Sequence, residues 1–397
     1  MTESPERLSE RQVTLLAIAA AIVTANAYYI HPIIALVAES FDVRPAWVGL
    51  VPAANQVALA VGILFLLPLG DRLSNRRMIS LALTAQILAL LTMALADSFR
   101  VFVAASTALG FFTITPYLLP AYASKRVRVG RLGHVTAVLA AGVITGILLS
   151  RTASGVVGEY LSWRTIYWIA AALMIAATVA LRRMLDDVVA APGGAAVGES
   201  YLRLIASLWP LMRYNRHVIL SGVIQGLSFG IFLLVWMGIG LHLTSEAVGL
   251  GVDDVGYLGI FSIVNAVTTP RLGRWADRVG PERARVVMSL VQMVGVALLF
   301  AAGDDFWYFS LPIVVLSIAG PMIDVTGRMT CLAADPAVRT RLMSLFITLM
   351  FLGGGIGSWA GTIAYDLGGW TLNIGLAMGS SAVIVLLSLL ALRVTVR

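Results

Sequence analysis

Long apolar stretches recur from one end of this chain to the other, and no other feature of the sequence constrains its fold as strongly. Each stretch runs for about 20 residues, and a helix of that length rises about 30 Å, the thickness of the hydrocarbon core of a membrane. Of the 397 residues, 59% are hydrophobic and 12% are charged, whereas soluble domains carry about 25% charged residues. The sequence therefore predicts an all-α membrane protein and excludes a soluble enzyme.

Hydropathy windows of about 19 residues divide the chain into twelve predicted spans. They lie near residues 13–37, 46–69, 78–96, 100–122, 134–157, 163–181, 217–241, 254–272, 285–302, 307–330, 341–364 and 371–391. The longest polar stretch, 182–216, separates the first six spans from the last six. The predicted organisation is an N-terminal six-helix bundle over 1–181, a cytoplasmic linker loop over 182–216 and a C-terminal six-helix bundle over 217–397.

The basic residues are distributed unevenly between the two sets of loops. With both termini in the cytoplasm, 23 of the 28 lysines and arginines fall in cytoplasmic segments, and the outer loops hold only Arg44, Arg100 and Arg164. Lysine and arginine resist translocation, so this asymmetry predicts a multi-pass protein of the cytoplasmic (inner) membrane with both termini cytoplasmic. The first twelve residues lack the basic segment and cleavage site of a signal peptide, so we expect the first span to be retained.

The two groups of six spans repeat one another. Four landmarks recur at a nearly constant offset of 206 to 211 residues: Asp71 and Asp277, Arg131 and Arg341, Gly142 with Gly146 and Gly353 with Gly357, and Trp163 and Trp370. A constant offset indicates a duplicated unit, and the glycines are expected to let helices approach closely. Two parallel six-helix halves form an alternating-access architecture, with the substrate site near the midplane between them. The repeat therefore predicts pseudo-symmetric bundles and favours transport over catalysis.

Two copies of a charged loop motif resemble a known family. The loop after the second span contains Gly70, Asp71, Arg72, Ser74 and Arg76, and its second copy spans residues 273–280 with Asp277 and Arg278. The chain thereby resembles the major facilitator superfamily, whose loop reads G-x-L-x-D-R-x-G-R-R, over essentially its full length.

The charged residues of these loops are candidates for a conformational latch. A carboxylate at a helix end accepts hydrogen bonds from the N-terminus of a helix in the opposite half and from nearby arginines. The alternative is plain topological charge. The latch candidates are Asp71, Arg72, Arg76, Asp277 and Arg278.

A narrower resemblance is to twelve-span bacterial exporters of the drug:proton antiporter type. It rests on Asn26, Tyr28, Tyr29, His31 and Pro32, where relatives tend to have N-x-Y-Y-x-Q-P, and on the glycine-containing segments 146–155 and 353–358. The resemblance implies a monomer that exports a small amphipathic organic molecule or drug by antiport with protons, and that uses the proton gradient in place of a cofactor. In this sequence Ile147 and Ser106 stand where the exporters have proline and arginine.

Charges inside a span are costly, so each is a candidate functional residue. Asp324 and Arg328 lie four residues apart, on one face of the tenth span. The functional interpretation is that Asp324 carries the coupling proton while Arg328 tunes it or binds an anionic group of the substrate. The alternative is a structural ion pair. In the fifth span, Arg151 is expected either to bind a substrate anion or to reach the outer headgroups or Glu39.

Polar and aromatic residues on the spans that line the cavity in the family complete the candidate site. His31 is a second candidate for proton handling, and it shares a helical face with Tyr28, while Asn26 and Tyr29 lie on another. A stripe with helical spacing on the seventh span combines Gln225, Phe229, Phe232 and Trp236. The predicted substrate-binding residues are Asn26, Tyr28, Tyr29, His31, Phe112, Tyr117, Arg151, Gln225, Phe229, Trp236 and Arg328. Packing is the alternative for each aromatic residue.

Several partners and activities are disfavoured. The basic residues form no continuous face for nucleic acid, the single cysteine, Cys331, excludes a disulfide and a cysteine-based metal site, and no nucleotide loop or hydrolase motif is present. We expect no enzyme activity, metal or cofactor; the expected partners are a small-molecule substrate, protons and membrane lipids. The alternative function is an importer or facilitator of a small organic anion, with Arg151 and Arg328 as ligands.

Overall fold

The computed structural model describes residues 8–67, 69, 74–124, 126–185, 208–301, 306–335 and 338–395, and within these residues the chain is helical and has no strand. The first half contains α1 (Glu10–Ala25), α2 (Ile30–Ser40), α3 (Pro45–Val48), α4 (Leu50–Leu66), α5 (Asn75–Leu95), α6 (Phe99–Phe112), α7 (Thr115–Ser124), α8 (Val129–Tyr160) and α9 (Trp163–Met184). The second half contains α11 (Leu208–Tyr214), α12 (Arg216–Leu243), α13 (Val252–Leu258), η2 (Gly259–Ile263), α14 (Val264–Val279), α15 (Pro281–Phe300), α16 (Phe306–Leu332) and α17 (Arg339–Thr395).

These elements make the twelve predicted membrane crossings. In the described residues, ten helices are long and apolar enough to span a membrane, and the last of them, Arg339–Arg393, contains two crossings. Gly368 and Gly369 interrupt α17 with non-helical backbone angles, so the predicted spans 341–364 and 371–391 are the two arms of one element. The remaining crossing consists of α13, η2 and α14. Its last element, α14, carries Arg271, Arg274 and Arg278 and is therefore less apolar.

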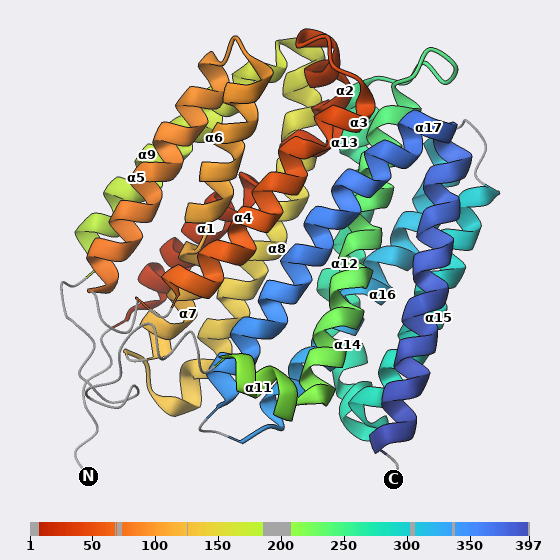
Figure 1. Ribbon diagram of the computed structural model, residues 1–397. Helices are drawn as coiled ribbons and strands as arrows, with labels where there is room; N and C mark the ends of the chain where they lie inside the picture. The colour runs from red at the N-terminus through yellow and green to blue at the C-terminus, as the bar shows by residue number, and fades with distance from the viewer. Residues whose placement is uncertain are drawn as a thin grey trace.

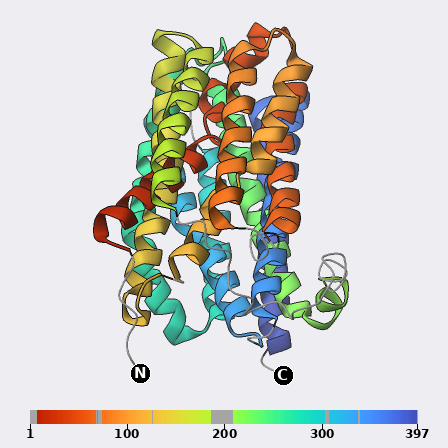
Figure 2. The ribbon, with the colours of Figure 1, turned by 90° about the vertical axis from the view of Figure 1, so that its left-hand side faces the viewer.

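The two halves lie side by side (Figure 1), and α1 begins and α17 ends at the same face of the bundle. We call this face the terminal face and the other the opposite face. Turned by 90°, the N-terminal half lies in front, with α5 and α9 nearest the viewer (Figure 2). The linker predicted over 182–216 falls largely outside the described residues.

Two crossings of the N-terminal half depart from α-helical hydrogen bonding partway along. Between α1 and α2, just before Pro32, the backbone N–H groups of Ala27 and Tyr28 donate to the carbonyls three residues earlier, and the fourth crossing leaves helical geometry between α6 and α7, just before Pro116. Proline lacks a backbone N–H donor, so the carbonyl four residues before it needs another partner in lipid. The side chain of Gln86 on α5 donates to the freed carbonyl of Phe112 at 2.9 Å. Non-helical backbone at this depth is tolerated where it is buried in protein or lines a cavity.

Glycines form the seams inside each half, as the sequence predicted. The helix α1 packs against α8, and α12 packs against α17. A Cβ added at Gly142 or Gly146 would overlap the backbone of α1, and one added at Gly353 or Gly357 would overlap the backbone of α12. The predicted close approach is confirmed, since each seam brings one helix backbone against another.

The halves are joined at the opposite face. Arg44 forms an ion pair with Asp366 at 2.6 Å, and the indole of Trp359 donates to the carbonyl of Ala46 at 3.1 Å. Glu159 accepts a hydrogen bond from the backbone N–H of Val252 at 3.1 Å. Three further contacts lie nearby: Thr152 with the carbonyl of Gly256, Tyr160 with Asp253, and α8 with α13.

One side of α4 lies toward the C-terminal half along its length. Val57 lies against Gly355 of α17, and Val61 and Phe65 follow it at helical spacing on the same side of α4. All three are a little more than one-third exposed, so the exposure of this stripe does not change toward the terminal face.

Candidate functional site

The side chain of Arg151 lies between the two halves. It projects from α8 and is fully buried. Among the described residues, no Asp or Glu lies within ion-pair distance of it. Its Nε and Nη2 atoms both lie 3.3 Å from Nδ1 of His31, which accepts a hydrogen bond from Nε. From the sequence, Arg151 could also reach the outer headgroups or pair with Glu39. Its full burial excludes contact with the headgroups, and its side chain pairs with His31 instead of Glu39.

Three aromatic rings from both halves surround this guanidinium. Its central carbon lies 4.1 Å from the ring centre of Trp236, 4.8 Å from that of Phe232 and 5.4 Å from that of Tyr28. Tyr28 also meets His31 edge to face at 5.3 Å. Cation–π contacts of this kind contribute about 0.5 to 2 kcal/mol each, which offsets only part of the cost of burying an unpaired charge.

Several polar atoms around this cluster lack a protein partner. In the described part of the chain, Nη1 of Arg151, Nε2 of His31 and Oγ1 of Thr24 are buried without a hydrogen-bond partner. Native proteins leave few buried polar atoms unsatisfied, so each such atom calls for an explanation. A ligand that supplies acceptors to the two donors is the explanation the geometry favours.

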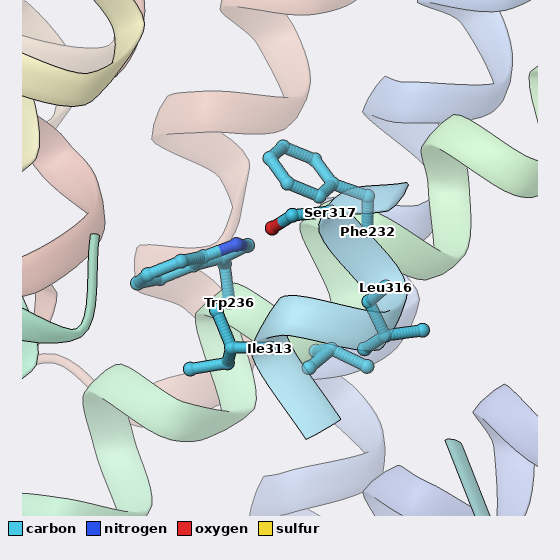
Figure 3. A pocket seen from close by; sticks show the side chains of 6 residues that line it. Phe232, Trp236, Ile313, Leu316 and Ser317 are labelled. Carbon is cyan, nitrogen blue, oxygen red and sulfur yellow. The ribbon is translucent and has the colours of Figure 1, made fainter. Parts of the chain in front are cut away.

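Two small hollows flank the cluster. One lies between α12 and α16 and is lined by Phe232, Trp236, Ile313, Leu316 and Ser317, so that the rings beneath Arg151 also form its wall (Figure 3). The other lies between the N-terminal half and α17, where Thr24, Tyr28, Tyr117 and Phe351 line it. Both combine apolar walls with a few polar groups, which is the usual composition of a small-molecule site.

A second charged pair lies on α16. Arg328 and Asp324 form the ion pair that their spacing predicted, with Nε to Oδ2 at 2.8 Å. The other carboxylate oxygen, Oδ1 of Asp324, is buried without a partner among the described residues. Arg328 also lies 5.9 Å from the ring of Phe346. In contrast to Arg151, this arginine has its charge compensated by a neighbour.

Some of the predicted site residues lie between the halves, and others lie inside the N-terminal half. Between the halves, Tyr28, His31 and Trp236 converge on Arg151. Phe229 stacks on Phe232 and meets Phe351 edge to face. Tyr117 meets the same Phe351 ring at 6.0 Å, and Gln225 is buried on α12 with Oε1 unpartnered in the described structure.

Three predicted residues lie inside the N-terminal half. Asn26 donates to Gln86 at 3.5 Å, a contact within that half. Phe112 meets Phe111 and offers its carbonyl to Gln86. Tyr29 is buried in the main apolar core.

The predicted latch lies at the terminal face. Asp71 and Arg72 lie outside the described residues. Arg76 is exposed at the start of α5, and Asp277 and Arg278 are exposed in the last turn of α14. The latch therefore stays a prediction.

Arg285 lies deeper in the protein than the sequence indicates. The hydropathy windows place it at the cytoplasmic start of the ninth span, 285–302, but it is 2% exposed inside α15. It donates to Ser221 at 2.8 Å, to Thr330 at 2.8 Å and to both oxygens of Thr326 at 3.1 and 3.2 Å. The signal that could have found it is the polar stripe that it forms with Ser289 and Gln292 at helical spacing, because such a stripe in a span faces protein rather than lipid.

Two six-helix halves with a charged, aromatic site between them define a membrane transport protein. The chain belongs to the Major Facilitator Superfamily, whose model matches residues 16–322 and 219–397. The family predicted from the loop motifs is confirmed, and the protein is a transporter rather than an enzyme.

Relatives and solved structures agree with this assignment. The chain is 26% identical over 371 residues to the uncharacterized transporter YgaY of Escherichia coli O157:H7, covering 93% of each chain. It is 25% identical to the probable transporter SCO4007 of Streptomyces coelicolor, covering 90% of this chain and 82% of that one. Its fold is similar to that of a point mutant of the nucleoside transporter NupG, with a TM-score of 0.78 at 15% identity over 96% of this chain and 99% of that chain.

A second solved structure shares the same fold. It is a bacterial homologue of the human lysosomal transporter Spinster, in an inward-facing and unoccupied conformation. The TM-score is 0.72 at 14% identity, over 97% of this chain and 96% of that one. At these identities the two likenesses show the fold alone.

Proposed function

We propose that this transporter carries a small organic anion across the cytoplasmic membrane by alternating access, in the direction of uptake and together with a proton. The observation that carries the proposal is Arg151, a fully buried guanidinium between the halves with no acidic partner in the described structure. A buried charge is retained against its desolvation cost where it has a function. Here that function is to hold an anion at the point where both halves meet.

The orientation proposed is the one that the basic residues favour, with the terminal face in the cytoplasm. In that orientation the contacts of Arg44 with Asp366 and of Trp359 with Ala46 close the external side. The conformation fits a carrier whose external gate is shut.

The sign of proton coupling follows from the charge of the cargo. An anion that enters a cell against an interior-negative potential loses about 2.3 kcal/mol per 100 mV, and a proton carried with it cancels that cost. Protonation of Asp324 would release Arg328 from its ion pair and add a second cation for the anion. Proton and anion then favour one another's binding, so they travel in the same direction.

A second candidate is the proton-coupled export of an amphipathic molecule or drug. The observation that favours it is Asp324, which has one carboxylate oxygen buried without a partner in the described structure. A cationic cargo would compete with the proton for this carboxylate, and competition produces antiport. In this version Asp324 is the central residue and Arg151 is secondary.

One experiment separates these functions. Cells that lack their own drug pumps would be given matched anionic and cationic probes, with and without a protonophore, for wild type and for Asp324→Asn. Accumulation of anionic probes that the protonophore and Asp324→Asn both reduce supports anion uptake. Protonophore-sensitive efflux of cationic probes, lost in Asp324→Asn, would instead establish the exporter.

Alternating access itself has a separate test. In a Cys331→Ser background, Arg44→Cys and Asp366→Cys place two thiols across the external contact. Joining them with a short reducible cross-linker should stop transport, and reduction should restore it. Transport that continues in the cross-linked protein would contradict the proposed movement, whatever the cargo.

A further inference from the structure

The edge of Arg151 that normally binds a carboxylate is held by a neutral group. Arginine pairs with carboxylates through two parallel N–H donors. In this structure Nε and Nη2 both point at a single nitrogen, Nδ1 of His31, at 3.3 Å. One imidazole nitrogen is a poorer partner for this fork than the two oxygens of a carboxylate.

We propose that Arg151 is the receptor for the carboxylate of a small aromatic monocarboxylate, and that His31 holds the place of that carboxylate while the site is empty. The proposal rests on the proposed transport of an organic anion and names the class of anion. In this proposal Arg151 binds the carboxylate of the cargo, and His31 occupies Arg151 when no cargo is bound. The rings of Tyr28, Phe232 and Trp236 contact the aromatic body of the cargo.

The charge balance selects a single negative charge. Arg328 already pairs with Asp324, so Arg151 is the cation at this centre that lacks a counter-charge among the described residues. One carboxylate neutralises it, and its two oxygens can also meet the unpartnered donors at Nη1 of Arg151 and Nε2 of His31. While Asp324 and His31 carry no proton, a dianion would bring a second charge that the described centre does not compensate.

The walls around the guanidinium select an aromatic body. The rings of Trp236, Phe232 and Tyr28 cover it from both halves, and the hollow between α12 and α16 continues from the first two rings toward Ile313 and Leu316 (Figure 3). Aromatic groups pack against such rings in offset or edge-to-face geometry, with a gain of about 0.5 to 1.5 kcal/mol beyond area burial. The hollow is small in this conformation, so the cargo enters by moving the half-buried Phe232 ring.

Proton binding at His31 links this site to pH. Within the described residues, the charged and titratable groups that face His31 are Arg151 from α8 and Tyr28 from the turn before α2, while α12 presents Trp236 and the backbone of Gly240. A proton on Nδ1 removes the acceptor that occupies Arg151 and places a second cation beside the bound carboxylate. Protonation and carboxylate binding therefore favour one another, and affinity should rise as the pH of the assay is lowered from about 8 to about 5.5.

The test measures binding to the full-length protein in detergent, by calorimetry and by tryptophan fluorescence. The probes are benzoate, 1-naphthoate and indole-3-acetate, each beside its neutral amide. The acids stay ionised across this pH range, because carboxyl groups titrate near pH ~4. In wild type we expect at least one acid to bind at least about 30-fold more tightly than its amide, and to bind about fivefold to tenfold more tightly at the lower pH than at the higher one.

Three variants assign the effect to its residues. Arg151→Gln should make acid and amide bind equally. His31→Gln keeps an acceptor for Arg151 but does not titrate, so it should keep the preference for the acid and lose its dependence on pH. Arg164→Gln is the matched control, because Arg164 also lies over an aromatic ring, 4.3 Å from the centre of Trp163, but at the start of α9, where it donates to the carbonyl of Ala96.

The outcomes separate this proposal from the transport proposal. The proposed carboxylate site is wrong if no acid binds more tightly than its amide in wild type, or if Arg151→Gln keeps the preference for the acid. This conclusion holds even if cross-linking of residues 44 and 366 stops transport as expected. If the acids bind through Arg151 with no pH dependence, the placeholder role of His31 is wrong. If the acids bind as predicted but none is accumulated by cells, the proposed direction of transport fails and the site stands.

Discussion

Two arginines lie inside this protein without an acidic partner among the described residues, and their surroundings are opposite. Arg285 on α15 donates four hydrogen bonds, to Ser221, Thr326 and Thr330, and ties α15 to α12 and α16. Arg151 on α8 shares one imidazole nitrogen and is otherwise covered by rings. Arg285 lies within one half, whereas Arg151 lies between the halves. A satisfied buried charge indicates a structural role, and an unsatisfied one between the two halves indicates a ligand.

The first prediction separates these roles at Arg151. We expect Arg151→Leu to lower carboxylate transport by at least about 100-fold, which corresponds to about 2.7 kcal/mol. The melting temperature should stay the same or rise, because the variant removes a buried charge that the protein alone does not compensate. Transport in proteoliposomes and thermal unfolding in detergent measure the two effects, and a variant that melts much earlier would assign Arg151 a structural role.

Arg285→Leu should do the reverse. It removes four hydrogen bonds that join three helices, so we expect a loss of about 1 to 3 kcal/mol and a melting temperature lower by about 3 to 10 °C. The transport rate per folded molecule should change by less than about threefold, which corresponds to less than about 1 kcal/mol. Unchanged thermal stability together with lost transport would place Arg285 in the transport pathway.

Lysine at each position sharpens the comparison. Arg151→Lys keeps the charge and loses the two-donor fork, so carboxylate affinity should fall about tenfold. Arg285→Lys keeps the charge and cannot reach all four acceptors, so it should lose about 1 kcal/mol of stability. Binding and melting measured on both variants test these values, and equal effects at the two sites would remove the distinction between them.

The smallest effect is expected at a third arginine, on the surface. Arg44 pairs with Asp366 across the contact at the opposite face, and its side chain is 70% exposed. Exposed ion pairs contribute about 0 to 1 kcal/mol, so Arg44→Ser should change the transport rate by less than about threefold. A complete loss of transport in Arg44→Ser would show that this single contact controls the external gate.

Much of the fold could be predicted from the sequence, because the signals are long and periodic. Apolar length located the crossings, the constant offset located the repeat, and the glycines of the fifth and eleventh spans located the seams. The repeat extends to Gln86 and Gln292, which are 206 residues apart and both bond to neighbouring helices of their own half. The span boundaries also placed Arg285 at a helix start, where periodicity does not distinguish a loop charge from a buried one.

The site was predicted less completely, because residue type does not fix side-chain direction. Tyr28 and Tyr29 are adjacent in sequence, yet Tyr28 faces Arg151 and Tyr29 lies in the main core. The i,i+4 spacing was enough to predict the Asp324 and Arg328 pair, since both residues lie on one helix. The contact between Arg151 and His31 joins residues 120 positions apart, and only the packing of α2 against α8 brings them together.

The glycine seams limit how this protein can evolve. Where backbone lies on backbone, at Gly226 with Gly353 and at Gly230 with Gly357, there are no side chains whose exchange could gradually change the packing. Any substitution there adds at least one carbon atom and parts the helices, so two neighbouring positions would have to change together. Substitutions that change cargo preference are therefore expected to accumulate between the halves, at rings such as Phe232 and Trp236, while the helix packing inside each half stays the same.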